Sequence, residues 1–183
     1  GLLTINADGT GAKNLTVTAA SMAEPAFLPD GRIAYIQKGN LFVMTPDGKK
    51  KVQMTDGGDV EGFKFSPDAK RVVLIKQVPY TASIEATPED LPLTTGMVIN
   101  DLNFKHWDQY VREIPHIFIA DVAKDKVQNV KDILDGEPYE CPMLPFGGSE
   151  QFCWSPDRAK MAYTCRKKTG VEYDISTDSD LYL

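Results

Sequence analysis

The sequence Phe-Leu-Pro-Asp-Gly at residues 27–31 decides the fold, because its pattern recurs twice further along the chain. The later copies are Phe-Ser-Pro-Asp at 65–68 and Trp-Ser-Pro-Asp at 154–157. Proline presets φ for the second position of a tight turn, and Asp beside Gly or a small residue suits the positions that follow. A short run rich in apolar and β-branched residues, opened by a cation, follows each turn, which is typical of a strand. Each copy therefore predicts a β-hairpin.

A second pattern recurs downstream of these hairpins and predicts a third strand. It consists of a polar residue followed by an aliphatic, an aromatic and an aliphatic residue, at 40–43, 116–119 and 180–183, and more loosely at 2–5. Another turn and a fourth short strand follow, as at 51–55 and 126–130. Pro29 and Pro67 lie 38 residues apart (67 − 29), close to the roughly 40–45 residues of one propeller blade.

The repeat predicts an all-β fold, a β-propeller fragment of about three four-stranded antiparallel blades. The expected divisions are the second half of a blade at 1–18, a blade at 22–55, a blade at 59–130 with a long insertion at 77–115, and the first three strands of a blade at 150–183. The second strands read as apolar on both faces, as packing between neighbouring blades requires. Propellers have about four to eight blades, so we expect a truncated piece of a longer chain; a complete small protein is the alternative.

The long connections are expected on one face, opposite the Pro-Asp turns. They run from about 77 to 115, from about 131 to 150 and from about 166 to 179. Connections of this length are usually functional or disordered. We therefore expect this face to meet a substrate, a partner or a second domain, and the alternative is that harmless insertions gather at loop tips.

Composition excludes several functions. The formal net charge is −6 and the pI about 4.9, and the sequence shows no basic patch for nucleic acid. No apolar run approaches the length of a membrane span, and no signal peptide is visible in this segment. Three cysteines without a Cys-x-x-Cys pair predict neither a disulfide framework nor a zinc site. If Trp154 faces Met161, then Cys153 faces Ala162 rather than Cys165.

Metal binding and catalysis within the chain are both disfavoured. His106, Asp108, Glu113 and His116 fit no standard metal site, and His116 occupies the polar position that opens a third strand. No cofactor is expected. The chain has no Gly-x-Ser-x-Gly elbow, so we expect no catalytic residue in it.

The best candidates for lining a substrate site are His106, Trp107 and Asp108. An aromatic side chain beside titratable groups on a long loop suits a peptide pocket. The alternative is that Trp107 anchors its loop onto the blade. By contrast, Phe27, Phe65 and Trp154 recur with the repeat and are expected to be core residues or to pack between blades.

The repeats, together with the stretch Asn-Asp-Leu-Asn-Phe-Lys-His-Trp-Asp at 100–108 and the stretch 146–157, resemble one known family. The resemblance is to the N-terminal propeller of prolyl-oligopeptidase-family serine peptidases, in particular the acylaminoacyl-peptidase and dipeptidyl-peptidase type of Bacteroides-like bacteria. It covers nearly the whole chain. The repeat itself is shared with TolB-like propellers.

The resemblance implies a non-catalytic, substrate-gating propeller that lines the pocket of a serine exopeptidase acting on short peptides. Its partners would be a C-terminal α/β-hydrolase domain, which supplies the catalytic residues, and the peptide substrate, in the periplasm or outside the cell. The chain lacks the Glu-Glu pair that holds the substrate amine in the dipeptidyl-peptidase IV branch. A TolB-like protein-binding propeller and a sugar-active propeller lyase are the alternatives. We also expect the isolated fragment to self-associate through exposed blade faces.

Overall fold

A computed structural model describes residues 1–16, 22–80, 84–85, 98–99, 102, 105–107 and 110–183. The described chain is nearly all β, with 44% of residues in strands and 5% in helices, so the predicted all-β class is confirmed. Asp108 and most of the 77–115 insertion lie outside the described residues. The division into blades at 1–18, 22–55, 59–130 and 150–183 stays a prediction.

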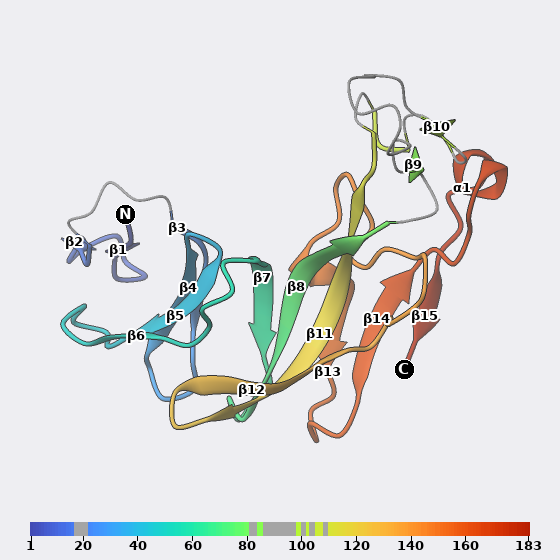
Figure 1. Cartoon of the computed structure of the whole chain (residues 1–183). Coiled ribbons are helices and arrows are strands. Elements are labelled where there is room, and N and C mark those ends of the chain that lie inside the picture. The colour runs from blue at the N-terminus through green and yellow to red at the C-terminus, as the bar shows by residue number, and fades with distance from the viewer. Residues whose placement is uncertain (17–21, 81–83, 86–97, 100–101, 103–104, 108–109) are drawn as a thin grey trace. The chain divides into compact units, whose positions relative to one another are not determined.

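The first complete sheet has four antiparallel strands that follow one another in sequence order, β3-β4-β5-β6 (Figure 1). Its strands are β3 (Met22–Phe27), β4 (Ile33–Gln37), β5 (Asn40–Met44) and β6 (Lys51–Gln53). A small two-stranded sheet, β1 (Leu3–Thr4) with β2 (Lys13–Asn14), precedes it in the chain. This order of consecutive antiparallel neighbours is the one that the four-strand repeat predicts.

The second complete sheet repeats the order as β7-β8-β11-β12. Its strands are β7 (Val60–Phe65), β8 (Arg71–Pro79), β11 (Glu113–Ala123) and β12 (Lys126–Asp132). The short pair β9 (Ile84–Glu85) and β10 (Val98–Ile99) falls within the 77–115 insertion. A third sheet follows with three strands, β13 (Phe152–Trp154), β14 (Met161–Cys165) and β15 (Asp180–Tyr182). The described residues also form two helical turns, η1 (Ser149–Gln151) and α1 (Val171–Ile175).

The Pro-Asp turns have the predicted hairpin geometry. The amide of Ala69 donates to the carbonyl of Ser66 at 2.8 Å, and the Ser66 amide donates to the Arg71 carbonyl at 2.9 Å. The residue after Asp takes a left-handed conformation in each copy, with φ of 82° at Gly31, 56° at Ala69 and 66° at Arg158. The last two are unusual for residues with a side chain, and the sequence does not reveal them.

The register of the third sheet agrees with the sequence prediction. Trp154 pairs with Met161 and Cys153 with Ala162. All three cysteines are free thiols, with Cys141 and Cys165 buried and Cys153 exposed. Two predictions are corrected. β11 begins at Glu113, so His116 lies inside the strand rather than opening it. Phe27 is 72% exposed on the edge strand β3 and is not a core residue.

The chain divides into two compact units, 1–76 with 118–131, and 77–117 with 132–183. The core of the first unit is built on β4, whose five residues are all buried. Ala34 and Ile36 belong to one hydrophobic cluster, and Ile33 and Tyr35 to another. Since successive side chains of a strand point to opposite faces, β4 is apolar on both faces, as predicted for a second strand.

Tyr35 is buried in the first unit beside a cation. Its ring stacks on Phe42 at 5.7 Å between centroids, and the Lys51 ammonium lies 4.2 Å from the Phe42 centroid and bonds to Gln37. The Tyr35 hydroxyl is buried without a hydrogen-bond partner among the described residues. Burial raises the pKa of Tyr35 to about 12.

Tyr35→Phe should leave the free energy of unfolding at neutral pH unchanged or raise it, because a buried hydroxyl without a partner costs roughly 1–3 kcal/mol. The unfolded tyrosine loses its proton near pH 10.0, before the folded one. The pH-dependent contribution of Tyr35 to the free energy of unfolding is therefore fully present below pH 10.0. It falls as the pH rises toward about 12. Urea unfolding should show a shallower alkaline loss in Tyr35→Phe than in the unaltered chain. An equal alkaline loss of stability in both proteins would contradict the raised pKa of Tyr35.

Gly39 closes the β4–β5 turn with φ of 68°, and a Cβ there would overlap the backbone carbonyl of Gly58. Gly39→Ala should lower the free energy of unfolding by about 3 kcal/mol, since a backbone clash adds to the left-handed strain. Gly31→Ala is the matched control. It has φ of 82° and nothing within 4 Å of the new Cβ, so it should cost only roughly 1 kcal/mol. Equal losses in urea unfolding would rule out the close approach.

Candidate functional site

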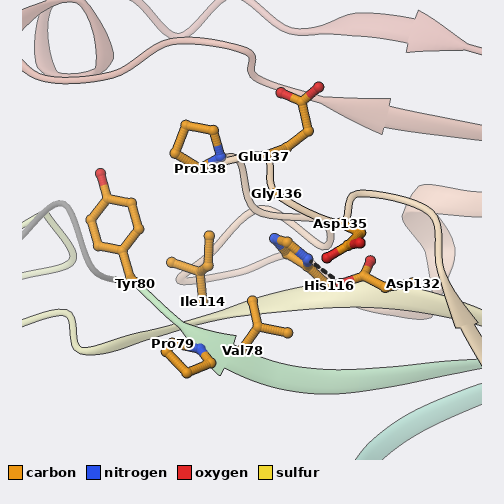
Figure 2. Close-up of a pocket in the computed structure, with 10 residues that line it drawn as sticks. All are labelled: Val78, Pro79, Tyr80, Ile114, His116, Asp132, Asp135, Gly136, Glu137 and Pro138. Atoms are coloured by element: carbon orange, nitrogen blue, oxygen red, sulfur yellow. Dashed lines mark hydrogen bonds and ion pairs between the residues drawn. The ribbon is translucent and has the colours of Figure 1, made fainter.

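The second compact unit contains a pocket of about 360 Å³ beside the neighbouring strands β8 and β11. Three groups of residues line it: the end of β8 and the residue after it, two residues of β11, and the segment from the end of β12 onward. They are Val78, Pro79, Tyr80, Ile114, His116, Asp132, Asp135, Gly136, Glu137 and Pro138 (Figure 2). The volume lies within the usual range of small-molecule sites.

The buried His116 pairs with the partly buried Asp132 in this pocket. Nδ1 of His116 lies 2.8 Å from Oδ2 of Asp132, and the other carboxylate oxygen accepts from the Leu134 amide at 2.8 Å. His116 is only 2% exposed because it lies within β11. Its Nε2 is buried without a hydrogen-bond partner among the described residues. The sequence signal for this site is a single histidine inside the otherwise apolar run at 114–120.

A second cluster in the same unit is built on Glu140, which is 0% exposed. The Tyr173 hydroxyl donates to Glu140 Oε1, and Nε2 of His106 lies 2.7 Å from Oε2. Burial and, next, the Glu140 charge raise the pKa of Tyr173 above its ordinary value. A buried carboxylate persists only when it is paired and hydrogen-bonded, so His106 and Tyr173 together stabilise it.

The Glu140 cluster joins three separate connections. His106 comes from the connection between β8 and β11, Glu140 from the link between β12 and β13, and Tyr173 from α1 in the connection between β14 and β15. These are the three long connections that the repeat assigns to one face. Neither Glu140 nor Tyr173 could be recognised from the sequence, because pairs of residues 33 and 34 positions apart leave no local pattern.

Lys105 stands between the pocket and the Glu140 cluster. Its ammonium lies 4.5 Å from the centroid of Tyr80, which lines the pocket, and 4.3 Å from that of Tyr173. The Arg166 guanidinium lies 4.5 Å from the same Tyr173 ring. Cation–π contacts of this kind are worth about 0.5–2 kcal/mol each. The two sites therefore share an aromatic and cationic boundary.

The predicted site residues are placed in different environments. His106 is largely buried against Glu140. Trp107 is 71% exposed, with φ of 57°, and its ring meets Phe146 edge-on at 5.3 Å. Phe146 is itself 80% exposed. Trp107 and Phe146 thus form an exposed aromatic pair, whereas Asp108 lies outside the described residues.

The described residues lack two features that would bear on function. Among them, no group of three or more His, Cys, Asp and Glu side chains is arranged to hold a metal ion. The described part of the chain also contains no helix with the length and apolar character that crossing a bilayer demands.

The strand order and the pocket define the class: an all-β chain of propeller-like antiparallel sheets with a polar pocket beside two neighbouring strands. No known family profile matches it. Over its whole length it is 43% identical to dipeptidyl-peptidase 5 of Porphyromonas gingivalis, and over 99% of its length 37% identical to dipeptidyl-peptidase 5 of Porphyromonas endodontalis. A dipeptidyl-peptidase 5 of Arthroderma otae is 22% identical over 92% of the chain.

The chain spans only 28%, 27% and 26% of the lengths of these three relatives. It therefore aligns with one part of each of these longer relatives. The relatives agree with the resemblance to dipeptidyl peptidases that the sequence indicates.

Tyr173→Phe should lower the free energy of unfolding by roughly 1–3 kcal/mol, because it removes a hydrogen bond from the buried Glu140 carboxylate. Tyr35→Phe, which removes an unpartnered buried hydroxyl, is the matched control and should not destabilise. Urea unfolding of both variants at neutral pH measures the difference. Equal effects would mean that the Tyr173 hydroxyl contributes nothing through Glu140.

Proposed function

We propose that this chain is the non-catalytic propeller portion of a serine exopeptidase acting on short peptides, and that it gates substrate access and lines the pocket. The observation that carries the proposal is the 43% identity to dipeptidyl-peptidase 5 of Porphyromonas gingivalis along the entire chain. In this proposal an α/β-hydrolase domain elsewhere in the longer protein supplies the nucleophilic serine and its acid and base partners. The longer protein acts in the periplasm or outside the cell.

The proposed lining residues are His106, Trp107 and Asp108. The exposed Trp107–Phe146 pair supports this role, because aromatic surface gives a peptide apolar contact area. His106 bonds to the buried Glu140, which suits a residue that holds the loop while its neighbour Trp107 meets the substrate. Asp108 follows Trp107 directly and remains a prediction from the sequence.

The first test is the longer protein itself. Its sequence should contain a Gly-x-Ser-x-Gly elbow outside this chain, and the purified protein should release dipeptides from peptides with a free N-terminus. A serine-directed inhibitor should abolish the activity. A longer protein with neither elbow nor peptidase activity would overturn the proposal, and protein binding or sugar cleavage would then identify the alternatives.

Trp107→Ala in the longer protein should lower kcat/KM for peptide substrates roughly tenfold, through loss of aromatic contact with the peptide. Stability should change by less than about 0.5 kcal/mol because the side chain is exposed. Phe27→Ala, which removes a similarly exposed aromatic residue from the other compact unit, is the control and should leave kcat/KM unchanged. Equal kcat/KM values for Trp107→Ala and the unaltered protein would exclude Trp107 from the substrate site.

A further inference from the structure

The backbone of Trp107 is held in a strained conformation. Its φ of 57° lies in the left-handed region, where a bulky residue is a genuine outlier. The side chain is also 71% exposed, so burial in a core does not fix it there. Strained residues persist only where their surroundings over-determine the backbone, and they gather at functional sites. The contacts around Trp107 therefore identify what holds it.

The anchor of Trp107 is the pair of residues that precedes it. Nε2 of His106 lies 2.7 Å from the Glu140 carboxylate, and the His106 ring meets Tyr173 edge-on at 5.9 Å. The Lys105 ammonium lies 4.3 Å from the centroid of the same Tyr173 ring. Glu140 and Tyr173 are themselves buried and bonded to each other. The chain is thus fixed to the interior immediately before Trp107.

Phe146, whose ring meets Trp107, has an anchor of its own. It lies in a turn closed by a hydrogen bond from the Gly147 amide to the Met143 carbonyl at 2.8 Å. The Met143 amide donates to Oε1 of Gln151 at 2.7 Å, which ties the turn to η1. A Cβ on Gly147 would lie only 2.4 Å from the Met143 carbonyl oxygen. The turn is therefore tight, and it holds the backbone of Phe146 while the ring stays exposed.

The two anchors stand at the two ends of one segment. Glu140 and Gln151 bound the stretch 140–151, which belongs to the link between β12 and β13. An exposed aromatic side chain ordinarily changes rotamer within picoseconds to nanoseconds. Fixing both backbones restricts this motion, and a preordered pair loses less conformational entropy when it binds a ligand.

We propose that Glu140 and Gln151 are positioning residues for the aromatic pair. Glu140 holds Trp107 through His106, and Gln151 holds Phe146 through its turn. Neither residue has to touch a ligand, since each acts through the ring that it orients. The ordering of the rings does not depend on peptidase activity, whereas its effect on a peptide substrate rests on the proposed function.

The first measurement is the time-resolved fluorescence anisotropy of Trp107. The chain contains two tryptophans, so Trp154→Phe leaves Trp107 as the only one. Gln151→Met removes the acceptor of the Met143 amide at nearly the same side-chain length, and should lower the residual anisotropy roughly twofold. Gln151→Glu keeps an acceptor oxygen and should preserve the anisotropy. Gln128→Met, the same exchange at an exposed position of β12, is the control and should change nothing.

The same signal tests the other anchor. His106→Ala removes the contact with Glu140 and should lower the residual anisotropy of Trp107 roughly twofold. His106→Gln, whose amide can still donate to the Glu140 carboxylate, should lower it less. Unchanged anisotropy in His106→Ala or in Gln151→Met would overturn the role assigned to that anchor. An equal fall in Gln128→Met would overturn both roles.

The second measurement is a double-mutant cycle in the longer protein that contains this chain. Gln151→Met should lower kcat/KM for peptides roughly fivefold, mainly by raising KM. It should lower kcat/KM no further in a Trp107→Ala background, because residues that act through one group are not additive. Multiplied effects would mean a general structural role and would overturn positioning toward the peptide. A longer protein without peptidase activity would refute the proposed function, and the anisotropy would still decide whether the two anchors order the rings.

Discussion

The left-handed residue that ends each Pro-Asp turn is the constraint on which the sheets depend. Gly31, Ala69 and Arg158 each allow the chain to reverse within a few residues, and the following amide-to-carbonyl bonds fix which residues of the two strands face each other. A slip of one position would exchange the two faces of a strand. Because the second strands β4 and β8 are buried on both sides, such a slip would misplace large side chains throughout the core.

The short turns carry no part of the candidate sites, whose polar residues come largely from the longer connections. In the second compact unit, three connections converge on the buried Glu140. The pocket is lined by the end of β8, the interior of β11 and the link that follows β12. The sheets supply rigid positions, such as that of His116 within β11, and the connections supply carboxylates such as Asp135 and Glu137. Function on loops held by a rigid scaffold is the usual arrangement.

The parts of the fold that depend on local pattern could be predicted from the sequence. The hairpins, the all-β class, the pairing of Cys153 with Ala162 and the doubly buried β4 all follow from short-range spacing. The left-handed conformation of Arg158 could not be predicted, because residues in this conformation are usually Gly or Asn. The prediction that Phe27 packs in the core was wrong. All three copies of the repeat lie on edge strands, but Phe65 packs against a core cluster whereas Phe27 is 72% exposed. A repeat marks equivalent positions but not what covers each of them.

The candidate site was predictable only where it lies in one stretch. His106 and Trp107 were recognised as neighbours on a long connection, but one is buried on Glu140 and the other is exposed. His116 was interpreted as a strand-opening polar residue, because its role depends on Asp132, sixteen positions away. Glu140 and Tyr173 meet only through tertiary structure.

The three cysteines differ in exposure, so that one of them, Cys153, is accessible to thiol reagents. Burial raises the pKa of Cys141 to about 12 and that of Cys165 to about 11, so near neutrality both thiols are protonated as well as covered. Cys153, exposed on β13, is open to reagents. A thiol-directed fluorophore would consequently mark β13 alone. Its emission would report, without any substitution, on whatever approaches that side of the third sheet.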